Sequence, residues 1–124
     1  MRTVAAIAVA GALGALARYG LEGLVSRRLP GAFPWGTFVV NVSGAFVLGF
    51  VFTVMTEQLT TAPWIRGAFM IGFVGAYTTF STFSFETYRL LEDGALGIAA
   101  ANALGSVAAG LGAVYLGVVT GRAL

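Results

Sequence analysis

The stretch that decides the fold is residues 95–119, ALGIAAANALGSVAAGLGAVYLGVV, which contains no charged side chain. A transmembrane α-helix needs about 20 consecutive, mostly apolar residues. This stretch meets that length, and its few polar side chains carry only an amide and hydroxyl groups. It therefore predicts a helix that crosses a membrane.

Similar stretches precede it, so the chain is predicted to hold four spans, at residues 3–24, 37–55, 64–90 and 95–119. The turn formers and most of the charges fall between these spans. No connection is long enough to hold a soluble domain. We therefore predict one four-helix transmembrane domain over residues 1–124.

The composition excludes several other classes of protein. Of the 124 residues, 58% are hydrophobic and 10% are charged, whereas a soluble domain usually carries about a quarter charged residues. Cysteine and histidine are absent, which removes thiolate chemistry and the commonest general base and metal ligand. All seven basic residues are arginines and the net charge is +2, too sparse for a nucleic-acid surface. We expect an all-α membrane protein, since only helices and closed barrels span a bilayer. Nothing in the sequence indicates catalysis, so we expect that it is not an enzyme.

The first span has a second interpretation, as a secretory signal. Arg2, the apolar stretch after it and Ala15-x-Ala17 resemble a signal peptide with its cleavage site. However, the apolar segment continues to Leu24, and the rest of the chain is also membrane-bound in character. A retained span is therefore favoured.

Four spans place both termini on one side of the membrane. That side would hold Arg2, Arg66 and Arg122, and the opposite side Arg27, Arg28 and Arg89, with Arg18 near it. Orientation follows the imbalance of basic residues between the two sides, and here that imbalance is nearly nil. The chain could insert both ways up and pair with an opposite copy, or a weak bias or a partner could fix one orientation.

Small residues recur every four positions along the last span, at Gly97, Ala101, Gly105, Ala109, Ala113 and Gly117, and along the first, at Ala6, Ala10 and Gly14. Such rows let two helix backbones approach closely. We expect them to pack helices together, either within one chain or between subunits.

The third span changes character midway. Residues 67–77 are apolar, whereas residues 78–86 read TTFSTFSFE. Glycine and paired β-branched threonines disfavour a regular helix, so the third helix is predicted to be broken near Gly75–Thr79. Unwound carbonyls cannot stay unpaired in hydrocarbon, and sodium is a known partner for them in transporter helices. The alternative is a plain kink solvated by the threonines.

Beyond the break, Phe80 and Phe83 lie one helical turn apart, with Ser81 and Thr82 between them. A phenyl ring has a positive edge, and hydroxyl groups donate directional hydrogen bonds. A lining of ring edges and neutral donors would suit a small, hard anion that must enter and leave quickly. The ordinary alternative for such a stripe is core packing or contact with lipid.

Amides also occur within the spans. Asn41 shares a helical face with Gly44, and Asn102 shares one with Ser106 and Gly110. Such residues line a pathway in some membrane proteins, but they more often hold helices together or bond their own helix. Both interpretations stay open.

Charges, by contrast, avoid the middle of the spans, so a proton relay is not predicted. Glu22 lies near Arg18 at the end of the first span and reads as an interfacial charge. Glu86 and Arg89 are three residues apart on a helix, where they could pair with each other.

These residues resemble the Fluc (CrcB) fluoride-channel family over almost the whole chain. The most specific motif is Gly72-Phe73-x-Gly75-x-x-Thr78-Thr79-Phe80-Ser81-Thr82-Phe83-x-x-Glu86. The supporting motifs are Gly14-x-x-x-Arg18-Tyr19, Gly36-Thr37-x-x-x-Asn41-x-x-Gly44 and Asn102-x-x-x-Ser106-x-x-x-Gly110.

The resemblance implies an antiparallel, dual-topology homodimer in the cell inner (plasma) membrane, with two pathways that let fluoride leave the cytoplasm passively. It implies that the fluoride pathway is lined by Asn41, Phe80, Ser81, Thr82, Phe83 and Ser106. It implies a structural sodium ion held by the backbone carbonyls of Gly75 and Thr78 from both subunits. Arg18 and Glu86 match charged residues that face the aqueous vestibules.

Two other functions stay open. One is a small proton-coupled exporter of cationic drugs, also with four spans, which would need a carboxylate deep in the first span. This chain has none there. The other is a structural subunit of a larger complex, which predicts no ion flux from the purified chain.

Overall fold

The computed structural model describes all residues, 1–124, and every regular element in it is helical. The elements are α1 (Arg2–Arg28), α2 (Trp35–Thr53), η1 (Val54–Gln58), α3 (Pro63–Arg66), η2 (Gly67–Val74), α4 (Gly75–Tyr77), α5 (Phe80–Glu92) and α6 (Leu96–Arg122). The η elements are π-helical turns that continue their neighbours. Together the elements form four rods, each long and apolar enough to cross a membrane: Arg2–Arg28, Trp35–Gln58, Pro63–Glu92 and Leu96–Arg122.

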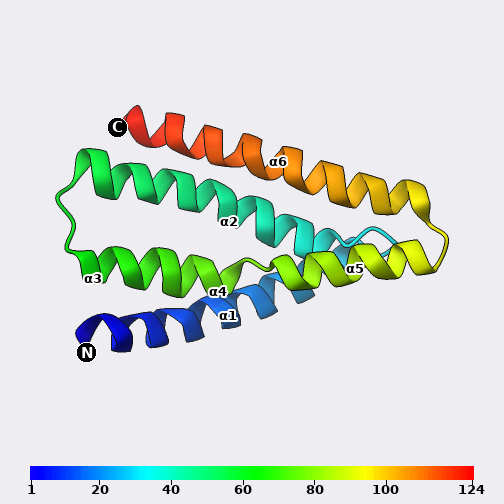
Figure 1. Cartoon of the computed structure of the whole chain (residues 1–124), viewed down its shortest axis with the longest axis horizontal. Helices are drawn as coiled ribbons and strands as arrows, with labels where there is room; N and C mark the ends of the chain where they lie inside the picture. Colours follow the sequence, from blue (N-terminus) through cyan, green and yellow to red (C-terminus); the bar gives the residue numbers. More distant parts are fainter.

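The four rods lie side by side along the long axis, with both termini at the same end (Figure 1). The most extensive contacts join α2 to α6 and α1 to η2. The third rod changes neighbour along its length, because η2 and α4 pack on α1 whereas α5 packs on α6. The change of neighbour coincides with the gap between α4 and α5, which Figure 1 shows as a short unwound segment.

The predicted break in the third helix is confirmed, and it is narrower than the sequence indicated. Only Thr78 (φ −88°, ψ 159°) and Thr79 (φ −149°, ψ 115°) are extended. Gly72 and Gly75 remain in helical turns. Gly72 instead allows close packing, since a Cβ there would lie 2.8 Å from the carbonyl oxygen of Ile7 on α1.

The small-residue rows pack helices together over only part of their length. A Cβ at Gly14 would collide with the backbone of Phe73, and one at Gly117 with the backbone of Phe46. Gly97, in contrast, faces open space. Residues four apart advance about 400° around a helix, so the row on α6 winds away from α2 as it runs toward the N-terminal end of that helix.

The core of the single chain is small. Only 15 of 124 residues are buried, and large apolar side chains are exposed along the outer faces of α1 and α6, such as Leu13, Leu16, Leu104 and Leu111. Surface of this kind must be covered by lipid or by another protein chain.

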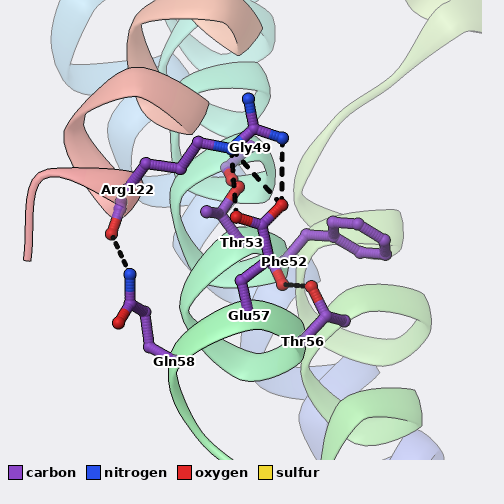
Figure 2. Close-up of polar contacts among 8 residues, drawn as sticks. Gly49, Phe52, Thr53, Thr56, Glu57, Gln58 and Arg122 are labelled. Atoms are coloured by element: carbon purple, nitrogen blue, oxygen red, sulfur yellow. Dashed lines mark hydrogen bonds and ion pairs between the residues drawn. The ribbon is translucent and has the colours of Figure 1, made fainter.

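Polar contacts close the end of the bundle that holds the termini (Figure 2). The guanidinium of Arg122 at the end of α6 donates to the Glu57 carboxylate of η1, with Nε–Oε2 and Nη2–Oε1 distances of 3.0 Å each. Gln58 donates to the Gly121 carbonyl at 3.4 Å. These contacts tie the second rod to the fourth one at their exposed ends.

Candidate functional site

Two side chains hold the break in the third rod, one from the break itself and one from α2. Thr79 caps α5, because its Oγ1 accepts a hydrogen bond from the Thr82 amide at 3.2 Å. The Asn41 side chain on α2 brackets the same residue. Its Nδ2 donates to the Thr79 carbonyl at 3.0 Å, and its Oδ1 accepts from the Thr79 amide at 2.8 Å.

Asn41 therefore satisfies both backbone groups of an extended residue that has no helical partners. An amide nitrogen carries two hydrogens, so one N–H of Asn41 is left after the bond to Thr79. That N–H can serve as a hydrogen-bond donor within the site.

The break also leaves carbonyl oxygens without donors. In a continuous helix the Gly75 carbonyl would accept from the Thr79 amide, but this amide is bonded to Asn41. No backbone amide reaches the Thr78 carbonyl. The Thr78 amide and hydroxyl both donate to Val74, at 3.0 Å each. Gly75 and Thr78 thus present free carbonyl oxygens, the ligand type that hard cations prefer.

The first turns of α5 carry the two predicted aromatic residues. The ring centroids of Phe80 and Phe83 are 5.9 Å apart with an interplanar angle of 46°. Phe83 is half-buried, whereas Phe80 is 79% exposed in the single chain. Ser81 is exposed and lies 3.4 Å from the Thr79 hydroxyl, and Thr82 is half-buried. This turn therefore presents one ring and one hydroxyl outward.

A recess of about 300 Å³ lies beside the break and brings several predicted residues together. Asn41, Thr78 and Phe80 line it, and Gly44 forms part of its wall. Thr78 packs directly on Gly44, where any Cβ would collide with its methyl group. The lining of the recess therefore includes an amide side chain, an aromatic residue and Thr78, whose carbonyl is free, and it includes no ionised side chain.

Ser106 takes part in a different set of hydrogen bonds. Its hydroxyl donates to the side-chain oxygen Oδ1 of Asn102 at 3.2 Å, and Nδ2 of Asn102 donates to the Thr87 hydroxyl at 2.8 Å. Asn102 is almost completely buried, at 1% exposure. These contacts join α6 to α5 on the side of Phe83, whose carbonyl accepts from Thr87 at 2.8 Å.

The two predicted vestibule charges lie in different surroundings. Arg18 on α1 donates through Nε to the Ala76 carbonyl at 3.2 Å, and its Nη1 is 3.9 Å from Glu22. Glu86 is half-buried, and its Oε1 is buried without a hydrogen-bond partner.

The predicted pairing of Glu86 with Arg89 is wrong. Arg89 lies 3.6 Å from Glu92 instead, because the end of α5 directs both exposed side chains to water while Glu86 turns toward the bundle. Glu86 and Arg89 do share a cavity of about 570 Å³ at the end of the bundle opposite the termini, near Trp35.

Comparison with known proteins identifies the family. The sequence profile described as "CrcB-like protein, Camphor Resistance (CrcB)" matches residues 5–118. The chain belongs to the CrcB family. A relative from Geotalea uraniireducens (strain Rf4), named "Fluoride-specific ion channel FluC", is 50% identical over 124 residues, covering 100% of both chains. Relatives of the same name are 48% identical in Nitratidesulfovibrio vulgaris (strain DSM 19637 / Miyazaki F), over 98% of each chain, and 47% identical in Solibacter usitatus (strain Ellin6076), over 94% of this chain and 95% of the relative.

The resemblance found in the sequence motifs is thereby confirmed, and this CrcB chain is a multi-pass membrane protein.

The sequence did not predict one contact at the break, in which the Tyr77 hydroxyl lies 2.8 Å from the Ser43 hydroxyl on α2. Phe69, Phe73 and Tyr77 form a stack, with centroids 5.7 and 6.0 Å apart. Their spacing of four residues was the signal that could have revealed the stack.

Proposed function

We propose that this CrcB-family chain is a fluoride-specific ion channel through which the anion crosses the membrane passively. The observation that carries the proposal is the full-length likeness, at 50% identity, to a relative that bears this name. A site built from neutral donors, aromatic edges and free carbonyls at a helix break supports it. Such a site has no nucleophile or acid–base pair, and the function is transport rather than catalysis.

Fluoride would exchange its hydration shell for groups of the protein. The free N–H of Asn41 and the hydroxyls of Ser81 and Thr82 would donate hydrogen bonds, and the edges of Phe80 and Phe83 would present positive ring hydrogens. Ser106 is proposed as a further hydroxyl of the pathway, and in the single chain this hydroxyl donates to Oδ1 of Asn102. Neutral groups bind an anion weakly enough to release it quickly.

The functional unit is proposed to be an antiparallel homodimer with two pathways. Two observations support this arrangement. Phe80 is 79% exposed in one chain, which leaves it accessible to a second copy that would enclose it. In addition, the near balance of arginines between the two ends favours insertion in both orientations. Pairing of opposite copies would bring their two breaks together.

A sodium ion is proposed between the two breaks. The carbonyls of Gly75 and Thr78 fit it, because they are oxygen ligands with no hydrogen-bond donor. Two from each copy would surround the ion. When bound, it would join the broken helices and add positive potential near the pathway. Since the ligands are backbone atoms, Thr78→Ala should preserve sodium binding.

The two charged side chains, Glu86 and Arg18, differ in how they fit the role of a vestibule charge. Glu86 is proposed to lie at a vestibule, because it lines the cavity of about 570 Å³ at the end of the bundle. Arg18 was predicted to face a vestibule as well, and it does border a recess of about 300 Å³ with Glu22. Its contact with the break gives it a second role.

The experiment that tests the function is fluoride efflux from liposomes that contain only this polypeptide. A fluoride electrode records release, and liposomes loaded with chloride provide the control. We expect rapid fluoride release and little chloride release, with no requirement for a proton gradient. Liposomes that stay tight to fluoride would refute the proposal and favour a structural subunit. Efflux of a lipophilic cation driven by protons would favour a drug exporter.

A further inference from the structure

Arg18 is a cationic side chain within the first membrane-spanning helix, Arg2–Arg28. Charges in such positions are costly, and their partners usually explain why they are present. The guanidinium of Arg18 is 31% exposed and makes two contacts in different directions. Nε donates to the backbone carbonyl of Ala76 at 3.2 Å, and Nη1 lies 3.9 Å from the Glu22 carboxylate on the same helix.

The Ala76 carbonyl needs such a donor. In a continuous helix it would accept from the Phe80 amide, but Thr78 and Thr79 are extended and carry Phe80 away. An unpaired carbonyl in a low-dielectric environment is costly. Arg18 therefore supplies a hydrogen-bond donor to the Ala76 carbonyl at the end of α4, as Asn41 supplies one to the Thr79 carbonyl.

The two contacts hold the break from opposite sides. Asn41 reaches it from α2, and Arg18 reaches it from α1. The free carbonyls of Gly75 and Thr78 each directly precede one of these held residues in the chain, Gly75 before Ala76 and Thr78 before Thr79. The Gly75 carbonyl belongs to the neighbouring peptide unit, so once the Ala76 carbonyl is fixed, only the two backbone dihedral angles of Ala76 set the direction of the Gly75 carbonyl.

We propose that Arg18 is a positioning residue, which fixes the end of α4 at the break through the hydrogen bond from its Nε to the Ala76 carbonyl. Its consequence for ion flux rests on the proposed channel function. The charge of Arg18 is secondary in this role, because what the Ala76 carbonyl requires is a donor at one point in space.

Two substitutions separate a donor from a charge. In glutamine, Nε2 is bonded to Cδ, the same place along the side chain as Nε of arginine, so Arg18→Gln keeps an N–H donor there and removes the charge. In lysine, Cε occupies that place and the ammonium lies one bond farther, so Arg18→Lys keeps the charge but moves the N–H donors one bond beyond the position of Nε. A positioning role favours glutamine, whereas attraction of anions by charge favours lysine.

The test compares both variants with the wild type by two measurements. The first is hydrogen–deuterium exchange of fragments that cover residues 75–82 in the purified protein, which does not depend on the ion transported. The second is fluoride efflux from liposomes. We expect Arg18→Lys to exchange these amides at least about tenfold faster and to lose flux by a similar factor, and Arg18→Gln to stay within about threefold of the wild type in both.

Arg27 provides the matched control, because it lies on the same helix, is exposed and has no hydrogen bond or ion pair. Arg27→Gln and Arg27→Lys should leave both measurements unchanged. The proposal is overturned if Arg18→Lys exchanges like the wild type, or if Arg18→Gln exchanges as fast as Arg18→Lys. Absence of flux from the wild type would instead refute the channel function, and the exchange result would still decide the role of Arg18.

Discussion

The contact between Gly44 and Thr78 offers a direct test of how α2 supports the break. A Cβ at Gly44 would collide with Thr78 Cγ2 and would lie 3.1 Å from Tyr77 Cδ1. Gly44→Ala should therefore reduce the free energy of unfolding by about 1–3 kcal/mol through overpacking. Thr78→Ser removes only the colliding methyl group and keeps the hydroxyl that donates to Val74 at 3.0 Å. Alone, it should cost about 1 kcal/mol for the lost methyl.

Combining the two substitutions should restore most of the loss, because the new methyl group occupies the space of the one removed. We expect a coupling of about 1–2 kcal/mol between the two sites. One tight contact remains in the double variant, between the new Cβ at position 44 and the Tyr77 ring. The hydroxyl of Tyr77 lies 2.8 Å from the Ser43 hydroxyl, and this contact holds the ring in place.

Unfolding by titration with sodium dodecyl sulfate, followed by circular dichroism, measures the free energy of unfolding. It is applied to the wild type, the two single variants and the double variant. Fluoride efflux from liposomes then shows whether the double variant also recovers transport. Additive effects, with a coupling below about 0.5 kcal/mol, would mean that α2 and the break are not packed as described.

Five further substitutions test three other parts of the molecule. Phe80→Ile and Phe83→Ile should each reduce fluoride efflux about tenfold while the melting temperature stays close to the wild type; unchanged efflux would remove the aromatic rings from the pathway. Gly117→Ala should destabilise the protein by about 1–3 kcal/mol in detergent unfolding, since its Cβ would collide with the backbone of α2, whereas Gly112→Ala on the open side of α6 should be neutral or slightly stabilising. Arg122→Gln breaks an exposed ion pair, so the melting temperature should fall by no more than about 2 °C, and the difference should vanish at high salt; a larger, salt-insensitive fall would contradict this.

The position of the break at the candidate site was predictable from one long motif. The stretch from Gly72 to Glu86 identified the family and the position of the break. A separate motif, from Gly36 to Gly44, indicated Asn41 as a residue of the site, and the structure brings Asn41 to Thr79. The bonds that Asn41 makes were not foreseen, because they depend on how α2 lies against a segment 38 residues away in the chain.

Other expectations failed or stayed incomplete for related reasons. Helical spacing suggested that Glu86 pairs with Arg89, but spacing alone does not say which side chain faces water. The row of small residues on α6 was expected to pack helices together, and the spacing did not say over what part of the helix. Only part of it can face one straight partner, since a four-residue period drifts around the helix.

By itself, the sequence determined that the protein crosses a membrane four times, that its third helix is interrupted and that it belongs to its family. These are local properties, since the hydropathy of a segment and the backbone preference of paired threonines do not depend on distant residues. The tertiary structure alone decided which carbonyls at the break are paired and which are free. That choice depends on where Arg18 of α1 and Asn41 of α2 come to lie, at separations of 58 and 38 residues from their partners. Hydrogen bonds act over about 3 Å, so only the packing of the helices brings such groups within reach.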